Sequence, residues 1–445
     1  MAKIKDSKKQ FVQNINVGLM GISFFLIFTG FFTVGGIQTL VFDSAQIANS
    51  TGYVEGFHGD GLWSLGLCYA FFTLTNLISP SILALMGLRP SMFVGALTYV
   101  LFIVPLLYLN GIFLYISSSI LGVGAAIFWT AQGKFLSLNS NEKTISRNTG
   151  IFYTMLQSSY CVGNVFVYFY FRGKSEIDKE TRDIVSSVLL SVASLGSLLI
   201  LLYRPTPWAD KEEEDQTVYS ALKDHAKFFF TIDMILLSFT FFYTGILLNL
   251  WSAVYGTCIG FTAAFGDERK GLTAISGMFV SVGEVLGGVI IGKLGSWTHK
   301  VGRSPIIISG FIFSALAFIL GFINLPNESP LGETTLLQTA LIDSNQYLVI
   351  IGSFLLGLAD ACIVTQCFSL MAGTFHQNTS SAFAIFHFMQ GIASSLAFFY
   401  SSLLPLYWQL LIALISASLG TITFCYVEYK NRGKEVELKD EISAL

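Results

Sequence analysis

Apolar runs of about 20 residues recur along this chain from near its N-terminus to residue 427. An α-helix needs a run of this length to cross the hydrocarbon core of a bilayer, whereas a membrane β-barrel shows alternating segments of about ten residues. The composition agrees, because 53% of the 445 residues are hydrophobic and only 12% are charged. We therefore predict an all-α polytopic membrane protein that is surrounded by the lipid bilayer.

Hydropathy predicts twelve transmembrane helices. Their ranges are 14–41, 62–87, 91–109, 112–136, 150–171, 184–203, 229–254, 272–294, 305–325, 347–371, 381–403 and 405–427. The longest polar connection carries two prolines and an acidic run, which are typical of a linker. We predict an N-terminal six-helix half over 1–203, a cytoplasmic linker over 204–228, a C-terminal six-helix half over 229–427 and a cytoplasmic tail over 428–445.

The Lys and Arg residues predict the orientation of these helices. With the N-terminus in the cytoplasm, 19 of the 25 Lys and Arg residues fall on the cytoplasmic side, as the positive-inside rule requires. An even number of spans then places both termini there, in either the plasma membrane or an endosomal or lysosomal membrane. Asn49 and Asn327 begin glycosylation sequons on the opposite side. They are predicted glycan acceptors, although each could also be a simple surface residue.

A weak internal repeat relates the two halves. The fourth span reads LGVGAAIFWTAQ from residue 121, and the tenth reads LGLADACIVTQ from residue 356. Gly122 aligns with Gly357 and Thr130 with Thr365, while Ala125 takes the place of Asp360. Further matches follow in the same order, such as FTG at 28–30 and YTG at 243–245. Repeated halves of this kind are typical of transporter folds.

Several classes of function find no support in the sequence. The net charge of −3 does not favour nucleic-acid binding, and the six cysteines are scattered without metal-ligand spacing. Gly122-x-Gly124 lies inside an apolar span without a preceding strand, which argues against a phosphate loop. We therefore expect neither an enzyme nor a bound cofactor or metal ion.

The predicted spans, halves, termini and middle loop resemble those of the major facilitator superfamily. That superfamily carries a glycine-rich and charged loop between its second and third spans. The second-half loop GKLGSWTHKVGRSP, from residue 292, keeps Gly292, Gly302 and Arg303 but has no Asp, and the first-half loop GLRPSM keeps little. The resemblance implies that these three residues belong to a cytoplasmic gate, whose usual charge pair is in doubt here.

Longer blocks resemble one branch of this superfamily more closely. They include WTAQGKFLSLNSNEKTISRNTGIFYTMLQSS from residue 129, GEVLGG from residue 283 and AFAIFHFMQ from residue 382. They are similar to the branch named for the nematode uncoordinated-ninety-three protein, and the similarity covers nearly the whole chain. The resemblance implies regulation of ion channels or trafficking of partner membrane proteins, and it carries over no substrate-binding residues.

Ionisable side chains deep in a span are functional candidates, because an unpaired charge is costly there. Three stand out: Asp360, Glu284 and His387. No Lys or Arg lies deep in any span, so each acid is either neutral or faces a wet cavity that admits a proton, a cation or a cationic solute. In the superfamily's architecture the tenth span lines the central cavity, which favours a cavity role for Asp360.

Each of these three residues also has a possible structural role. A neutral acid can hydrogen-bond a neighbouring helix, worth about 0.6 kcal/mol on average in a membrane. Glu284 lies in a glycine-rich stripe that also predicts close helix packing, and His387 could be a satisfied polar group. Four uncharged residues could line the cavity or join helices to each other: Thr130, Gln132, Thr365 and Gln366.

Two functions follow from the sequence. The first is a secondary transporter of a small solute, with Asp360 coupling transport to protons. The second is a non-transporting regulatory or trafficking subunit of an ion channel or another membrane protein. Neither the solute nor the partner can be named from the sequence.

Overall fold

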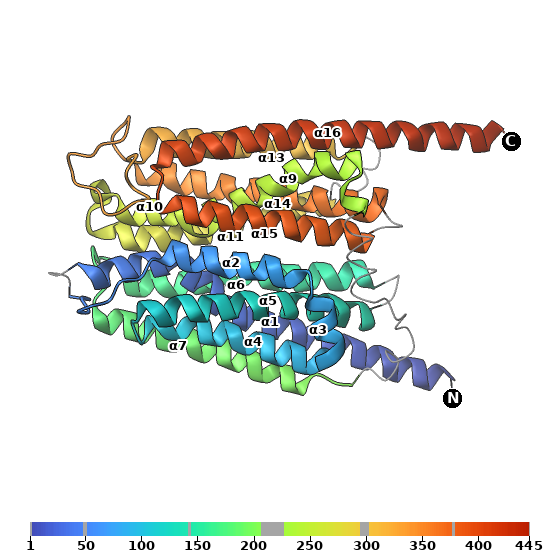
Figure 1. The fold of residues 1–445 in the computed structure, drawn as a ribbon, viewed down its shortest axis with the longest axis horizontal. Coiled ribbons are helices and arrows are strands. Elements are labelled where there is room, and N and C mark those ends of the chain that lie inside the picture. Colours follow the sequence, from blue (N-terminus) through green and yellow to red (C-terminus); the bar gives the residue numbers. More distant parts are fainter. Residues whose placement is uncertain are drawn as a thin grey trace. The chain divides into compact units, whose positions relative to one another are not determined.

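The computed structural model describes residues 2–47, 51–140, 144–205, 227–293, 302–375 and 379–444. Within these residues the regular structure is helical and contains no β-strand (Figure 1). The predicted all-α fold is therefore confirmed. The helices of the first half are α1 (Ala2–Gln46), α2 (Gly61–Asn76), α3 (Ser79–Met86), α4 (Leu88–Ile103), α5 (Gly111–Leu138), α6 (Ile145–Phe171) and α7 (Lys179–Leu199).

The second half is built in the same way. Its helices are α9 (Ile232–Asn249), α10 (Tyr255–Phe261), α11 (Arg269–Lys293), α13 (Ser304–Asn324), α14 (Gln346–Thr374), α15 (Thr379–Ser401) and α16 (Leu406–Ala444). A π-helical turn, Leu250–Val254, joins α9 to α10. Each of the twelve predicted spans corresponds to a helix or a helix pair among the described residues.

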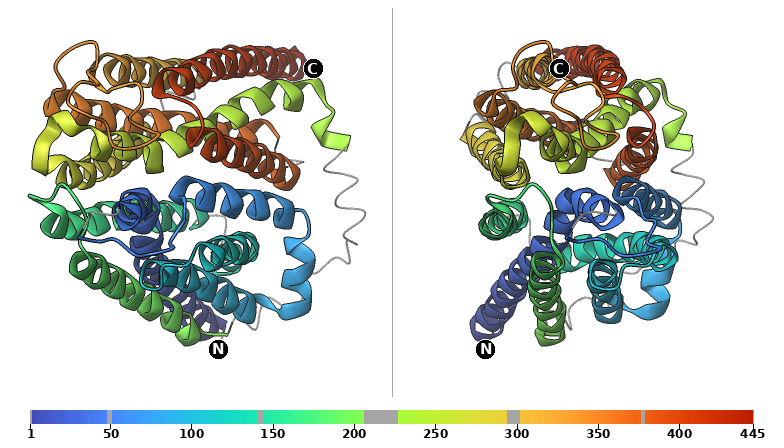
Figure 2. Two further views of the ribbon diagram at one scale, coloured as in Figure 1. Left: turned by 60° about the vertical axis from the view of Figure 1, so that its left-hand side comes forward. Right: turned by 90° about the vertical axis from the view of Figure 1, so that its left-hand side faces the viewer.

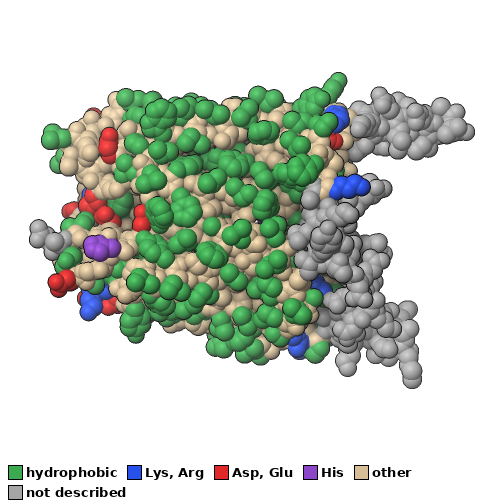
Figure 3. Space-filling view, in the orientation of Figure 1, with side chains coloured by type: hydrophobic (Ala, Val, Ile, Leu, Met, Phe, Trp, Pro, Cys, Tyr) green, Lys and Arg blue, Asp and Glu red, His purple; other side chains and the backbone are tan. Residues whose placement is uncertain are grey.

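The described helices give an approximate span count. Ten helical segments are long and apolar enough to cross a membrane, and the pair α2 and α3, bent by 73°, would make an eleventh. Pro80 stands at the start of α3 and has no N–H to continue the preceding helix, which accounts for the bend. The helix at the fifth predicted span, α6, lies outside this group and carries polar residues such as Gln157 and Asn164. Figure 3 shows hydrophobic side chains along the helices and charged side chains near their ends.

The chain forms two compact units, which are described separately. Unit 1 comprises 1–218 together with 259–261 and 266–278, and unit 2 comprises 219–258, 262–265 and 279–445. Unit 1 thus includes two short segments that the sequence assigns to the second half. The predicted domain boundaries stay a prediction.

The same helix pairing occurs in each unit (Figures 1 and 2). In unit 1, α1 packs on α6 and α7, while α4 packs on α5 and α7. In unit 2, α9 packs on α15 and α16, while α13 packs on α14 and α16. Because equivalent spans make equivalent contacts, the internal repeat seen in the sequence corresponds to a repeated arrangement of helices.

Two glycines that align in the repeat each bring two helix backbones close together. A methyl group on Gly122 of α5 would lie 2.3 Å from the carbonyl oxygen of Cys68 on α2. A methyl group on Gly357 of α14 would lie 2.0 Å from the carbonyl oxygen of Val280 on α11. Membrane helices use small residues in this way to bring their backbones together. The shared glycine therefore sets a helix–helix distance in each unit.

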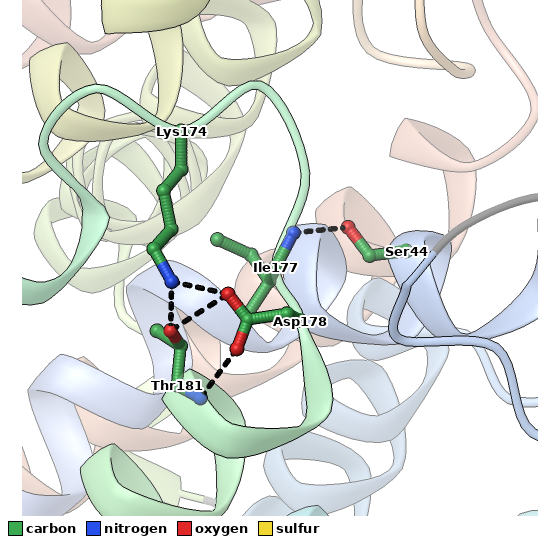
Figure 4. A network of polar contacts seen from close by, with 5 residues as sticks. All are labelled: Ser44, Lys174, Ile177, Asp178 and Thr181. Atoms are coloured by element: carbon green, nitrogen blue, oxygen red, sulfur yellow. Dashed lines mark hydrogen bonds and ion pairs between the residues drawn. The ribbon is translucent and has the colours of Figure 1, made fainter.

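An aspartate fixes the start of α7. Asp178 is its N-cap, and the Asp178 carboxylate accepts hydrogen bonds from the backbone N–H of Thr181 at 2.8 Å and from the Thr181 hydroxyl at 3.0 Å. The Lys174 ammonium group also bonds to this carboxylate (Figure 4). Partial burial acts to raise the pKa of Asp178, but the hydrogen bonds from Lys174 and Thr181 outweigh it, so the pKa lies below its usual value.

We predict that Gly357→Ala destabilises the protein, because the added methyl group forces α14 away from α11. Overpacking of this kind costs roughly 1–3 kcal/mol. The matched control is Gly288→Ala on α11, where the added methyl group meets open space and alanine favours the helix. Thermal unfolding in detergent, followed by the reaction of a thiol dye with buried cysteines such as Cys367, checks both variants. Equal melting temperatures for the two would contradict the close contact.

We predict that Asp178 stabilises the fold in a pH-dependent manner. Its folded-state pKa is lowered, so its contribution is fully present above the unfolded-state value of about 3.9 and is lost as the pH falls through the folded-state value. Removal of an N-cap side chain costs roughly 0.5–2 kcal/mol, so Asp178→Ala should lower the melting temperature at pH 7. The difference from the wild type should shrink between pH 4 and pH 3, and a difference that is constant with pH would refute the assignment.

Candidate functional site

Asp360 lies in the middle of α14, in unit 2. The helix begins after Asn345, whose side chain accepts a hydrogen bond from the Tyr347 N–H at 2.9 Å. At 1.5 Å per residue, Asp360 stands roughly 22 Å along the helix from this cap. Its side chain is half-buried. The structure therefore places a carboxyl group at mid-depth of an apolar helix, with part of its surface accessible.

The partner of this carboxyl group comes from an irregular turn. The indole N–H of Trp251 interacts with Asp360, although the pair falls short of the geometry of a full hydrogen bond. Trp251 belongs to the π-helical turn Leu250–Val254. Turns of this kind are rare and are frequent at functional sites. Tyr243 on α9 is also near enough to Asp360 to experience its charge, so α9 and α14 face each other here.

Among the described residues, no Lys or Arg pairs with Asp360. The basic side chains described in unit 2 stand near the ends of helices or, for Lys430, near the end of the apolar segment Leu406–Asn431 of α16: Lys227, Lys293, Arg303 and Lys430. Lys430 bonds to Asp233 at 2.6 Å, which links α16 to the start of α9. The neighbour of Asp360 is thus a neutral donor, the Trp251 indole N–H. An ionised Asp360 would have no Lys or Arg beside it among the described residues to balance its charge.

Glu284 lies in the contact between α11 and α14. Its side chain is 5% exposed, and glycines stand on both sides of it in the sequence. A methyl group on Gly283 would lie 2.3 Å from the Phe354 carbonyl oxygen, and one on Gly287 would lie 2.6 Å from the Ala361 Cβ. The glycine stripe is therefore close helix packing, as its sequence suggests. Glu284 occupies the same interface, one turn of α14 away from Asp360 through Gly357.

His387 belongs to a different polar chain. Its side chain lies near that of Gln390, one turn further along α15, and interacts with it. The Gln390 side chain in turn donates to the hydroxyl of Thr244 on α9 at 3.2 Å. The structure thus gives His387 and Asp360 separate partners. These contacts favour the structural interpretation of His387, while its predicted role in coupling stays a prediction.

The four uncharged candidates are divided between the units. Thr130 in unit 1 shares a 2.7 Å hydrogen bond with Ser79 of α3 and donates to the Ala126 carbonyl. Gln132 is buried in the same unit. In unit 2, Gln366 is buried and donates to the Thr365 hydroxyl at 3.3 Å. Thr130, Thr365 and Gln366 thus make contacts within or between helices, and a cavity role for all four residues stays a prediction.

The predicted gate loop is described in part. Gly292 is exposed near the end of α11, residues 294–301 lie outside the described residues, and Gly302 has a φ of 101° that glycine adopts readily. Arg303 follows, and its guanidinium group lies 3.8 Å from the Glu428 carboxylate of α16. Its Nε also donates to the Ser369 hydroxyl at 2.9 Å. The loop has no Asp, but Glu428 supplies a charge partner from another helix.

Glu428 also caps α13 and is the residue that the sequence analysis missed. Its carboxylate accepts hydrogen bonds from the Arg303 N–H and, at 2.7 Å, from the Ser304 hydroxyl. An anion is favoured at a helix N-terminus, so one carboxylate serves two purposes. The available signal was an acid directly after the last predicted span, in FCYVEYK. The π-helical turn around Trp251 left no signal in the sequence pattern.

Of the two predicted glycan acceptors, the structure describes one. Asn49 lies outside the described residues. The side-chain oxygen of Asn327 accepts a hydrogen bond from the Tyr407 N–H at 2.9 Å, at the start of α16. Asn327 is half-buried and holds α16 in place, so it has a structural role whether or not it carries a glycan. Glycosylation of both residues stays a prediction.

Comparison with solved structures identifies the fold. The chain superimposes on the nucleoside transporter NupG with a TM-score of 0.64 and 11% identity, covering 92% of this chain and 99% of the other. A POT family transporter in complex with 5-aminolevulinic acid gives a TM-score of 0.64 and 12% identity, covering 93% and 96%. At such identities the likeness shows the fold alone. It is the fold of major-facilitator transporters, as the sequence analysis expected.

Comparison of sequences identifies the family. UNC93-like protein MFSD11 of Xenopus tropicalis is 38% identical over 436 residues, covering 93% of this chain and 96% of the relative. Protein unc-93 homolog A of Mus musculus is 25% identical over 488 residues, covering 96% and 99%. A family model described as "Ion channel regulatory protein UNC-93" matches residues 55–425. These matches confirm the resemblance drawn from the sequence blocks, and the chain belongs to the UNC-93 family.

Proposed function

We propose that this protein is a secondary transporter of a small solute and that Asp360 couples transport to protons. The observation that carries the proposal is the Asp360 carboxyl group at mid-depth of α14, half-exposed and without a basic partner among the described residues. Such a group can exist as a neutral acid when enclosed and as a carboxylate when water reaches it. A change of access then changes its protonation, which is what coupling requires.

The neighbours of Asp360 fit this role. Trp251 offers an uncharged N–H, which can stabilise the carboxylate without holding it permanently ionised as an Arg would. The major facilitator fold supports the proposal, since repeated halves can expose a central site to either side of the membrane in turn. Solved structures with this fold include proteins described as transporters of nucleosides and peptides.

A second function is favoured by the family match. The family description names an ion channel regulatory protein, and a chain of this kind could act as a regulatory or trafficking subunit of a channel. In that case the Asp360 carboxyl group would stabilise the fold or the complex rather than move a proton. A specific partner should then copurify with the chain.

We predict that Asp360→Asn abolishes proton-coupled flux while the protein still folds and reaches the membrane. The amide keeps the size of the carboxyl group but cannot release a proton. Proteoliposomes that contain a pH-sensitive dye, given a pH gradient and a panel of small solutes, measure the flux. The matched control is Asp343→Asn, the same chemical change in an exposed loop, which should transport as the wild type does.

Two outcomes decide between the functions. If Asp360→Asn transports as fast as the wild type, the proposed coupling role of Asp360 is wrong. Absence of flux in every protein, together with a channel that copurifies equally with wild type and Asp360→Asn, establishes the regulatory function instead. Proximity labelling in cells followed by mass spectrometry identifies that partner.

A further inference from the structure

The connection between α13 and α14 in unit 2, residues 325–345 and here called the outer loop, is bound to the helices at both of its ends. Near its end, the Ile342 N–H donates to the Ile323 carbonyl of α13 at 3.0 Å. Near its start, the Asn327 carbonyl accepts a hydrogen bond from the Leu406 N–H of α16 at 2.7 Å. Figure 1 shows the outer loop, in orange, beyond the ends of α13 and α14. It is therefore an ordered part of unit 2 that stands clear of the helices.

The middle of the outer loop is a tight turn that presents two leucines. The Gln338 N–H donates to the Thr335 carbonyl at 3.0 Å. The Gln338 side-chain oxygen also accepts a hydrogen bond from the Thr335 N–H at 2.7 Å. Leu336 and Leu337 stand between these two residues and are 76% and 93% exposed. Turns favour Gly, Pro, Asn, Asp or Ser for their backbone conformation, so the geometry of the turn does not explain two leucines.

Aromatic side chains indicate that this turn lies in water. Tyr347 and Trp408 are exposed at the starts of α14 and α16, and Tyr and Trp are enriched at the interface between membrane and water. The outer loop extends past these helix starts, on the side of the membrane predicted to be non-cytoplasmic. The apolar surface of the two leucines is therefore hydrated, and its burial against a partner would be favourable.

The charges of the outer loop favour a protein partner over a lipid surface. The loop carries Glu328, Glu333 and Asp343 and has no Lys, Arg or His. No Lys or Arg occurs between Arg303 and Lys430, so unit 2 presents only acids in its predicted non-cytoplasmic connections. Segments that bind a membrane surface are rich in Lys and Arg and are attracted to anionic lipids, whereas carboxylates are repelled. A complementary partner is therefore a protein surface with basic residues.

The attachment of the outer loop limits where this partner can be. Leu337 precedes Ile342 by five residues, and five extended residues span at most about 18 Å. Because Ile342 is bound to α13, the turn cannot reach far from the membrane. The partner must present its binding surface there, as the non-cytoplasmic domain of a membrane protein does.

We propose that the turn Thr335–Gln338 is a docking site for another membrane protein, whose non-cytoplasmic domain receives Leu336 and Leu337 in an apolar pocket with Lys or Arg residues at its rim. The acids of the outer loop steer the encounter and exclude acidic partners. Because the turn already holds the leucines in place, binding costs little conformational entropy. The proposal does not rest on transport, since a regulatory subunit and a transporter with an accessory protein would use such a contact equally.

Photocrosslinking in living cells tests the docking site. The full chain carries p-benzoylphenylalanine in place of Leu337, and irradiation joins this probe to the molecule that lies against it. We expect an adduct with one protein, and mass spectrometry should place the crosslinked peptide in a non-cytoplasmic domain, beside Lys or Arg residues. The same probe in place of Tyr53, an exposed residue of a unit 1 loop, should not give this adduct.

A second substitution in the chain that carries the Leu337 probe tests the apolar part of the contact. Leu336→Ser should lower the adduct yield about tenfold, the change that about 1.4 kcal/mol gives. The matched control is Leu403→Ser, the same change at an exposed leucine in the connection between α15 and α16, which should leave the yield unchanged. Both side chains are exposed, so equal melting temperatures should show that neither change disturbs the fold.

The charged part of the contact is tested in isolated membranes, where the salt concentration can be varied. Added salt should lower the adduct yield, because it screens exposed charges. Glu328→Gln with Asp343→Asn should lower the yield at low salt and remove its dependence on salt. Glu55→Gln, which removes an exposed acid from unit 1, should do neither.

Four outcomes would overturn the docking site: adducts to lipid alone, adducts to a second copy of this chain, absence of any protein adduct, or equal yields in Leu336→Ser and Leu403→Ser. Adducts to lipid would place the turn in the membrane instead. The adduct is measured without reference to flux. Its appearance as expected in a protein that transports nothing therefore upholds the docking site and removes the transport function alone.

Discussion

Hydrocarbon offers no hydrogen-bond partner to a polar group, and this constraint governs the whole chain. Hydroxyl groups inside the helices bond back to carbonyls one turn earlier, as Thr29 does to Phe25 and Ser353 does to Val349. Others join helices, as the Tyr243 hydroxyl does with Ser314 at 2.6 Å. Helix backbones approach each other closely where small residues such as Gly122 and Gly357 remove the bulk of the side chain. Polar groups that are not needed for such bonds are therefore the candidates for a functional role.

Much of the fold could be predicted because periodicity and length report directly on a single helix. Every predicted span has a helix among the described residues, and the aligned Gly122 and Gly357 occupy equivalent contacts. The candidate site was predictable only in part. The depth of Asp360 could be read from the apolar run around it, but its neighbour Trp251 depends on a π-helical turn, and the partner of Arg303 is Glu428, 125 residues later. Such contacts depend on packing between distant segments, which a local pattern does not report.

The two units differ most where the repeat aligns Asp360 with Ala125. In unit 1, Ala125 stands one turn of α5 before Phe128, on which Phe24 stacks with ring centres 4.3 Å apart. Trp129 in the same cluster donates its indole N–H to a neutral hydroxyl, that of Tyr99, at 3.1 Å. Unit 1 thus has aromatic packing close to this position in the helix, and Ala125 carries no carboxyl group. The duplicated scaffold therefore does not need an acid there, which strengthens the case that Asp360 serves chemistry rather than folding.

The uneven distribution of basic residues has a structural counterpart. Six Lys and Arg residues were predicted on the non-cytoplasmic side: Arg172, Lys174, Lys179, Arg182, Arg269 and Lys270. Three of them make contacts in unit 1: Lys174 bonds to Asp178 at the start of α7, Arg182 donates to the Gly52 carbonyl, and Arg269 donates to the Ser175 carbonyl. These three of the six residues thus make specific contacts within unit 1. Two cations in the first turn of a helix oppose its dipole, so the positions of Arg269 and Lys270 follow from tertiary contacts within unit 1: Arg269 donates to the Ser175 carbonyl, and the Lys270 ammonium group lies 5.1 Å from the centre of the Phe261 ring.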